Sequence, residues 1–510
     1  MESGAASSFC LRNRTLWYLL LMCLVIYVFS AKGYLQIWDT SFSLQTAEAV
    51  LERGQLDIPY VEGGTLTWRD GRSYSKYGIG LPLYYIPIVA VSKPLSRVTR
   101  LHNPELTWFL ISFASIPFAI LTLVFFAKLL RLLGIAEIHV NLLLVSLGLG
   151  SLTWPYAVSD CSEAMQMGLL TLAVYGVVRR SYPALIAGGM AFAWLVLVKV
   201  IYVVFLPVFA IYLFTRPGEL RHRLKILASF TFPFLVACCF ICWLNVVRFG
   251  SPLESGYGSE SGQFFPSHMW HTVPKLLVSL DKGLFIFCPI LILGVLGWKD
   301  FFERHRAEAI LCLTLIIENL IWSASWWSWY GGWSWGPRLL VPTVPLWLLP
   351  GAFLLQKVQS RRRLCIFALV TSVAVILQIP GVLVKDQEIH QIKQGMLTPA
   401  EQTAAPSDYV AAYILLKHKL VSHNELYRLS ELGIPGNREL DLEKYRTFHG
   451  LNLWTNLSSR QFNKPAIRWL PILGLLIVIF LAVQIGKAVR ADLTQIRLQP
   501  EDSNFERTLS

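Results

Sequence analysis

The chain has 510 residues, of which 54% are hydrophobic and only 15% are charged. An average soluble domain carries about 25% charged residues, so the composition excludes an ordinary soluble protein. The net charge of +13 does not indicate a nucleic-acid partner, because lysine and arginine gather at alternate ends of apolar runs, which is the pattern of membrane topology.

Apolar runs long enough to cross a bilayer recur along the chain. Lipid offers no partners for backbone N–H and C=O groups, so such runs must be helical. The sequence therefore predicts an all-α polytopic membrane protein with about twelve transmembrane helices, each of about 20 apolar residues. The expected spans are 14–32, 106–127, 138–156, 163–178, 183–200, 201–215, 226–247, 283–298, 307–326, 339–356, 364–384 and 468–487.

The first span follows Arg12 and Arg14, and no convincing cleavage site comes after it, so we expect an uncleaved helix rather than a signal peptide. With the N-terminus in the cytoplasm, every expected inner segment carries lysine or arginine, as the positive-inside rule requires. Of the nine cysteines, Cys161 alone is expected in an outer loop, which excludes a disulfide framework.

Two outer regions are long. The first, residues 33–105, holds an amphipathic helix at 41–54 that ends at a glycine, a hairpin at 56–78 with turns at 63–64 and 70–71, and a short interfacial helix at 79–96 that we expect Pro82 and Pro87 to interrupt. The second, residues 385–467, is polar and is expected to form a small cap. We thus divide the chain into residues 1–357, with the first outer region, and residues 358–510, with the second and a cytoplasmic tail at 488–510.

Five charged residues are expected at one depth near the outer face: Asp39, Lys76, Asp160, Glu163 and Arg338. Charged groups at a membrane are costly and are therefore candidates for function. Acids and bases that converge in an interfacial pocket suit a substrate with a lipid tail and a polar head.

Structural roles compete with this interpretation. Asp39 and Asp160 could cap helices, since aspartate is a favoured N-cap, and Lys76 could be an ordinary interfacial lysine. Lys199 and Glu318 fall within apolar spans, and we expect them to form a structural bridge between helices.

Residues 323–338, "SASWWSWYGGWSWGPR", are unusually rich in tryptophan. An aromatic belt at the membrane interface is the simplest explanation. Because sugar rings stack on aromatic rings, we also consider a saccharide or acceptor platform made of Trp329, Tyr330, Trp333 and Trp335. No group of histidine, cysteine or carboxylate side chains has convincing metal-ligand spacing, although His268 and His271 share an outer loop, so no metal and no cofactor are expected.

Several stretches, in order, carry a family resemblance: Asp39 just after the first span, Gly54, "KYGIGLPLYY" from Lys76, "VRFGSPLESGYGS" at 247–259, "LDKGLFIFCP" at 280–289 and "WSWYGGWSWGPRLLVPTVP" at 327–345. The chain resembles the GT-C glycosyltransferases that use polyprenyl-phosphate sugars, and among them the bacterial relatives of protein O-mannosyltransferases and of the lipid A aminoarabinose transferase. The resemblance covers most of residues 14–357. Two departures are Thr40, where the family often has a second acid, and the absence of a double proline after Lys76.

The resemblance implies an inverting transfer of a hexosyl or pentosyl group from a polyprenyl-phosphate monosaccharide. Asp39 would be the catalytic base, Glu163 or Asp160 the second acid, and Lys76, Arg338 and Lys282 would bind the donor phosphate. The acceptor would be a polysaccharide, a glycolipid or a protein, and the site would face the outside of a membrane, such as the periplasmic side of a bacterial inner membrane.

A transporter or flippase of a lipid-linked saccharide is the main alternative, and Lys199 and Glu318 are the residues that favour it. Transporters usually hold polar groups near the midplane on broken helices of inverted repeats, whereas the candidates here lie at the outer edge and no repeat is visible. A non-catalytic scaffold would not need Asp39, Lys76 and Arg338 at one level.

Overall fold

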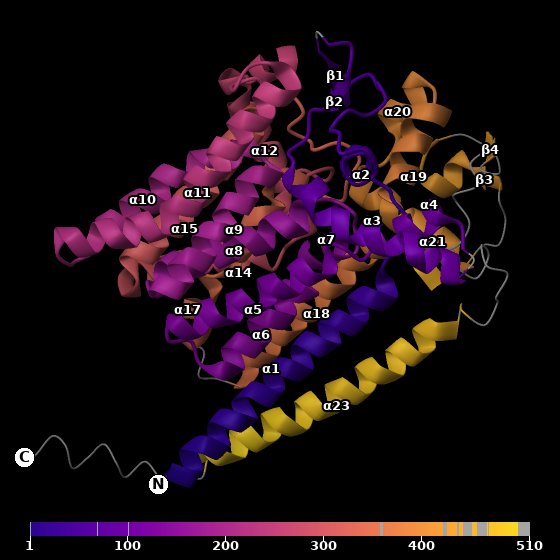
Figure 1. Ribbon diagram of the computed structural model, residues 1–510. Helices are drawn as coiled ribbons and strands as arrows, with labels where there is room; N and C mark the ends of the chain where they lie inside the picture. The colour runs from indigo at the N-terminus through magenta and orange to yellow at the C-terminus, as the bar shows by residue number, and fades with distance from the viewer. Residues whose placement is uncertain are drawn as a thin grey trace, which may run out of the picture.

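The computed structural model describes residues 2–68, 70–99, 101–357, 361–421, 426–435, 438–441, 451–455, 467 and 469–497. Within these residues the fold is all-α, as the sequence predicts, apart from two small antiparallel hairpins (Figure 1). The first pairs β1 (Thr65–Thr67) with β2 (Ser73–Ser75), and the second pairs β3 (Leu426–Arg428) with β4 (Glu439–Asp441).

Six helical segments of the described chain are long and apolar enough to cross a membrane: Asn103–Leu132, Leu220–Phe249, Arg306–Ser325, Arg338–Gln356, Cys365–Leu383 and Leu470–Ala488. Shorter apolar helices accompany them at Arg14–Ser30, Glu137–Gly148, Tyr182–Val198 and Val200–Phe214. The protein is therefore an integral, multi-pass membrane protein, and the count of about twelve spans stays a prediction.

The helices of the apolar body are α1 (Glu2–Ser30), α5 (Ile116–Leu132), α6 (Glu137–Gly148), α7 (Thr153–Ala157), α8 (Glu163–Arg179), α9 (Tyr182–Val198), α10 (Leu206–Phe214), α11 (Leu220–Phe249), α13 (Leu284–Phe287), α14 (Leu291–Arg304), α15 (Arg306–Ser325), α16 (Val344–Leu348), α17 (Gly351–Gln356), α18 (Arg361–Leu383) and α23 (Leu470–Arg497). The remaining helices are α2 (Trp38–Arg53), α3 (Gly80–Thr99), α4 (Asn103–Ile111), α12 (Met269–Val278), α19 (Asp386–Gln391), α20 (Pro399–Ala404) and α21 (Asp408–Val421). Short 3-10 segments are η1 (Val200–Phe205), η2 (Gly258–Gly262), η3 (Pro266–His268), η4 (Arg338–Thr343) and η6 (Leu429–Leu432), and η5 (Ile392–Met396) is a π turn.

Several expected spans are broken into two or three helices. The run 183–215 divides at Lys199, whose backbone is extended (φ −151°, ψ 106°), so α9 ends at Val198. Pro289 and Pro350 lie at two other breaks, between α13 and α14 and before α17. Proline cannot donate to the helix ladder, and irregular backbone at membrane depth is tolerated where protein surrounds it.

Close helix packing holds the centre of the body together. α8 is buried almost all round and lies between α5 and α9, and α9 packs in turn on α11. Gly176 of α8 faces Gly188 of α9, and a Cβ atom on Gly176 would lie only 2.9 Å from the Gly188 Cα. Small residues at such contacts let helix backbones approach, which is the usual basis of helix association in lipid.

The first outer region follows the predicted order of helix, hairpin and helix. The hairpin is confirmed, with the 70–71 turn between its strands. The expected interruption of α3 is wrong, because this helix continues for 20 residues through Pro87 and Pro94. Its residues Leu81, Tyr85, Val89 and Ser92 form one buried face, and burial of that face offsets the missing proline hydrogen bonds.

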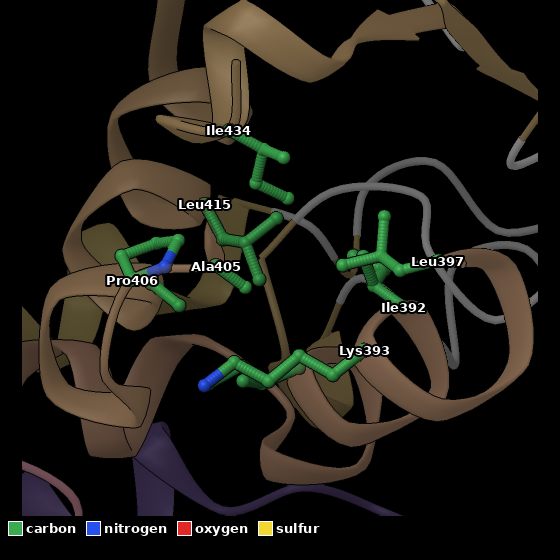
Figure 2. A pocket seen from close by; sticks show the side chains of 9 residues that line it. Ile392, Lys393, Leu397, Ala405, Pro406, Leu415 and Ile434 are labelled. Atoms are coloured by element: carbon green, nitrogen blue, oxygen red, sulfur yellow. The ribbon is translucent and has the colours of Figure 1, made fainter. Parts of the chain in front are cut away.

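The outer cap comes from the second outer region. Its helices α19, α20 and α21 enclose a small apolar core, where Leu397, Leu415 and Ile434 surround a narrow space (Figure 2). A buried ion pair between Glu388 of α19 and Lys419 of α21, 3.0 Å long, joins two of these helices. Residues 422–425, 436–437, 442–450 and 456–466 of the expected cap lie outside the described residues.

Figure 1 shows α2, the β1–β2 hairpin and the cap helices at one end of the molecule. The first turns of α1 and the last turns of α23 lie at the opposite end, and these two helices run side by side. The expected tail at 488–510 begins within α23, which continues to Arg497, and the rest of it lies outside the described residues.

Candidate active site

Arg338 forms the centre of a cluster of charged side chains. Its Nη2 atom donates to Oδ2 of Asp39 and its Nε atom to Oε1 of Glu163, both at 2.8 Å. Asp39 lies in the first turn of α2, Glu163 opens α8 and Arg338 opens η4, so three distant segments meet here. Arg338 and Glu163 are largely buried (12% and 2% exposed side chains), whereas one third of Asp39 is exposed.

The helix-cap hypothesis for Asp39 is wrong. The N-cap position of α2 is Ile37, and no side chain caps this helix end. Burial raises the pKa of the Asp39 carboxyl, but the Arg338 guanidinium and a hydrogen bond from the Tyr77 hydroxyl outweigh burial and leave the pKa below its ordinary value. The carboxyl group is therefore ionised at neutral pH.

Lys76 pairs with Glu260, which no sequence motif singled out. Its Nζ atom lies 2.9 Å from both carboxylate oxygens of Glu260, and 5.4 Å from the centre of the Tyr257 ring. The segment after Lys76 lies against the break that follows α9: a Cβ atom on Gly78 would stand 2.4 Å from the carbonyl oxygens of Leu197 and Val198. Only glycine, which has no Cβ atom, permits this approach.

These groups line one cavity of about 490 Å³. Its polar lining includes Asp39, Lys76, Glu163, Lys199, Asn245, Arg248, Glu260 and Arg338, and its aromatic lining includes Tyr77, Tyr257, Trp322, Trp326 and Trp327. Aliphatic side chains such as Leu81, Ile201, Ile241 and Leu244 also line it. The lining thus combines charged groups with apolar side chains.

Asp160 does not line this cavity. Its Oδ2 atom accepts the backbone N–H groups of Gln36 and Ile37, both at 3.0 Å, at the entrance to α2. Thr40 donates its hydroxyl to the Asp160 carbonyl oxygen at 2.7 Å. Burial raises the pKa of Asp160 to about 6. Asp160 therefore holds the segment that carries Asp39.

Lys282 also lies outside the cavity lining. It is 4% exposed, and its Nζ atom donates to the carbonyl oxygens of Ser334 (2.6 Å) and Gly332 (3.3 Å). Lys282 therefore supports the backbone of the tryptophan-rich loop just before Arg338.

The four expected platform residues lie around the cavity rather than in its lining. Trp335 is buried, with its ring centre 4.8 Å from that of Phe287 and 5.7 Å from that of Tyr409. Trp333 stacks on His390 of the cap, Trp329 lies beneath Lys275, and Tyr330 is 40% exposed. Trp326 and Trp327 of the same run line the cavity instead. The sequence of the run alone does not show which of its tryptophans face the cavity.

Two cations of the cavity had a sequence signal. Arg248 directly follows the expected span 226–247; it is buried and donates to the Ser75 carbonyl oxygen (3.1 Å) and to Asn245 (2.9 Å). Lys199 lies at the α9 break with its Nζ atom 5.1 Å from the Trp322 ring centre. The predicted bridge from Lys199 to Glu318 is wrong, because no ion pair joins them in the described part of the chain.

Among the described residues, no group of three or more histidine, cysteine or acidic side chains could hold a metal ion. The stretch with His268 and His271 has no such cluster, and His268 stacks on Phe265 instead.

No family model matches the chain, and no curated protein matches it. Solved structures similar to it include ArnT from Cupriavidus metallidurans bound to undecaprenyl phosphate, with 15% identity, a TM-score of 0.46, and coverage of 78% of this chain and 70% of that one. The apo state of the same ArnT has 14% identity, a TM-score of 0.48 and coverage of 81% and 71%. The apo oligosaccharyltransferase of Archaeoglobus fulgidus has 8% identity and a TM-score of 0.48, and the match spans 77% of this chain and 59% of that chain. Sequence identities this low assign no role to any cavity residue. Only the contacts that each residue makes in this chain bear on its role.

Proposed function

We propose that this protein is an inverting glycosyltransferase that moves a sugar from a polyprenyl-phosphate donor to an acceptor hydroxyl at the outer face of the membrane. The observation that carries the proposal is the meeting of Asp39, Lys76, Glu163 and Arg338 in one cavity. These are residues that the family resemblance singles out, and they come from separate segments of the chain.

The cations of the cavity suit a lipid phosphate. A glycosyl phosphate leaves as a phosphate that is already anionic at neutral pH, so it needs positive charge more than a general acid. Arg338 and Lys76 supply charge-assisted hydrogen bonds, and Arg248 adds a third cation in the same lining. The aliphatic side chains of the lining, such as Leu81 and Ile241, suit the first units of the polyprenyl chain.

Asp39 is the proposed base. Its ionised carboxylate takes the proton of the acceptor hydroxyl while the hydroxyl oxygen attacks the anomeric carbon. The bond between that carbon and the phosphate oxygen breaks, and polyprenyl phosphate leaves from the opposite face, which inverts the configuration. A single carboxylate suffices, unlike in glycosidases, which use a carboxyl pair. Glu163 orients Arg338, and Asp160 positions the start of α2.

The test is transfer by the purified full-length chain in lipid nanodiscs that contain a sugar-charged undecaprenyl phosphate, with release of undecaprenyl phosphate as the readout. Asp39→Asn should lower turnover by about 10²–10⁴-fold, the usual contribution of a general base. Glu62→Gln is the matched control, because Glu62 is an exposed acid of the same outer region. Turnover by Asp39→Asn close to that of the control would exclude Asp39 as the base.

A transporter of a lipid-linked saccharide remains the second candidate, and one observation favours it. Lys199 lies in the cavity lining at the break after α9, and broken helices are typical of transport sites. Movement of the labelled lipid across a vesicle membrane without release of undecaprenyl phosphate would favour this candidate over transfer.

A further inference from the structure

The segment that carries Glu260 borders the cavity. We define residues 250–263, between α11 and the Gln263–Phe265 backbone contacts described below, as the strap. Ser255, Tyr257 and Glu260 of the strap line the cavity together with Lys76. The strap lies directly on the lysine segment, since a Cβ atom on Gly256 would stand 3.1 Å from the Lys76 Cα.

Both ends of the strap are fixed by hydrogen bonds to the body. At its start, Asn245 of α11 donates to the Pro252 carbonyl oxygen at 3.1 Å. At its end, the Trp327 N–H donates to the Gln263 carbonyl oxygen at 3.1 Å, and the Phe265 N–H donates to that of Ser325 at 2.7 Å. The intervening residues 253–262 carry Gly256 and Gly258 in left-handed conformations (φ 85° and 51°), which glycine adopts in tight turns without steric cost.

Between these two anchors, a salt bridge joins Glu260 of the strap to Lys76. Both carboxylate oxygens lie 2.9 Å from the lysine Nζ atom, so Glu260 takes up two of the three N–H donors that the ammonium group could offer to another anion. Three-quarters or more of each side chain is buried (12% and 25% exposed), so solvent screens the pair less than it would at an open surface.

We infer that Glu260 is a counter-ion that occupies Lys76 in place of the substrate phosphate, and that the phosphate must displace it. This inference rests on the proposed function, because it concerns the same phosphate site. A phosphate that binds Lys76 while Glu260 stays in place meets a like charge at close range. Binding therefore releases Glu260, and the strap moves between its two anchors. Glu260 thus sets the affinity of the site for anionic substrates.

The first arm of the test measures the contact without any substrate. The purified full-length protein in nanodiscs is treated with a limiting, water-soluble acylating reagent, and labelling of each lysine is quantified by mass spectrometry. Glu260→Gln should raise labelling of Lys76 several-fold. Lys93 is the internal control, because its pair with Glu52 (2.8 Å) lies in the same outer region but outside the cavity. Unchanged labelling of Lys76 would overturn the inference.

The second arm measures binding of undecaprenyl phosphate and of inorganic phosphate separately, by quenching of tryptophan fluorescence. Glu260→Gln should tighten binding of undecaprenyl phosphate about tenfold, which corresponds to about 1.4 kcal/mol, whereas a variant with a merely damaged cavity would bind more weakly. Glu260→Asp keeps the negative charge and should bind undecaprenyl phosphate with nearly the wild-type affinity. Glu52→Gln should have the same affinity as the wild type. In a Lys76→Ala background, Glu260→Gln should give no gain, since the double-mutant cycle isolates the pair.

The outcomes separate the two proposals. Binding of undecaprenyl phosphate that is equally tight in the wild type and in Glu260→Gln would contradict the counter-ion role alone. Failure of every variant to bind undecaprenyl phosphate, with inorganic phosphate still bound more tightly by Glu260→Gln, would contradict the proposed donor and leave the counter-ion role standing.

Discussion

Asp39 and Arg338 lie 299 residues apart in the sequence, and the Nη2 atom of Arg338 donates a hydrogen bond of 2.8 Å to Oδ2 of Asp39. The Nε atom of the same guanidinium binds Glu163, so the planar fork of arginine holds two carboxylates at once. This geometry joins the start of α2, the start of α8 and the tryptophan-rich loop, so the proposed base and the proposed phosphate ligand are in direct contact.

The first prediction concerns this fork. Arg338→Lys should weaken donor use nearly as much as Arg338→Ala, because a point charge on a flexible stem cannot hold two carboxylates in one plane. Each change should cost about 1.5–3 kcal/mol, the usual contribution of a hydrogen bond to a charged group. The measurement is kcat/KM for the lipid donor, with exposed Arg72→Lys as the control. Wild-type kcat/KM in both Arg338 variants would exclude a role in phosphate binding.

The second prediction is a pH profile that distinguishes two acids. A base must be unprotonated, so kcat/KM falls as the pH falls through the pKa of the base in the free enzyme. Arg338 and Tyr77 hold the pKa of Asp39 below its ordinary value despite burial. The kcat/KM should therefore stay level between about pH 5 and pH 7, which is above the pKa of about 3.9 of an ordinary aspartate. Burial raises the pKa of Asp160 to about 6. An acidic limb near that pH would therefore identify Asp160 as the titrating group.

The third prediction concerns the structural role of Asp160. Asp160→Ala should lower thermal stability, because the N–H groups of Gln36 and Ile37 lose their acceptor and an unsatisfied buried donor costs about 1–3 kcal/mol. Asp160→Asn keeps an oxygen acceptor and should be milder. Thermal unfolding in detergent measures both, and equal melting temperatures for the wild type and Asp160→Ala would contradict this role.

The fourth prediction separates two tryptophans of one run. Trp335 is 3% exposed and packs on Phe287 and Tyr409, so Trp335→Ala should destabilise the fold by about 3–5 kcal/mol. Trp327 lines the cavity and is 41% exposed, so Trp327→Ala should change substrate KM and leave the melting temperature nearly unchanged. If Trp327→Ala instead lowered the melting temperature and Trp335→Ala changed only the substrate KM, the cavity would not be where the substrate binds.

The fifth prediction is topological. Single cysteines introduced at Glu62, before the β1–β2 hairpin, and at Arg221, in the first turn of α11, should react with a membrane-impermeant thiol reagent from opposite sides of the membrane. The expected outer position is 62, because the Lys- and Arg-rich segments belong to the cytoplasmic side. Labelling of position 62 only after the membrane is permeabilised would place the cavity on the inner side and remove the basis for an outer-face transferase.

The sequence by itself determined the membrane class, the all-α fold and the order of helix, hairpin and helix in the first outer region. Each depends on local chemistry: apolar length fixes a span, and a turn sequence such as Asp70-Gly71 fixes a turn. It also singled out Asp39, Lys76, Glu163 and Arg338, because a charge beside an apolar span is conspicuous in any sequence.

Only the tertiary structure decided how these charges are used. Asp160 and Glu163 are three residues apart, yet Glu163 faces the cavity and Asp160 turns toward the backbone before α2. Likewise Trp335 is buried while Trp327 borders the cavity. Which direction a side chain takes depends on where α8 and η4 pack against distant segments, and no local spacing records that. Glu260 is the clearest case: it lies in a polar loop with no distinguishing neighbours, and only the fold brings its carboxylate to Lys76, 184 residues earlier in the chain.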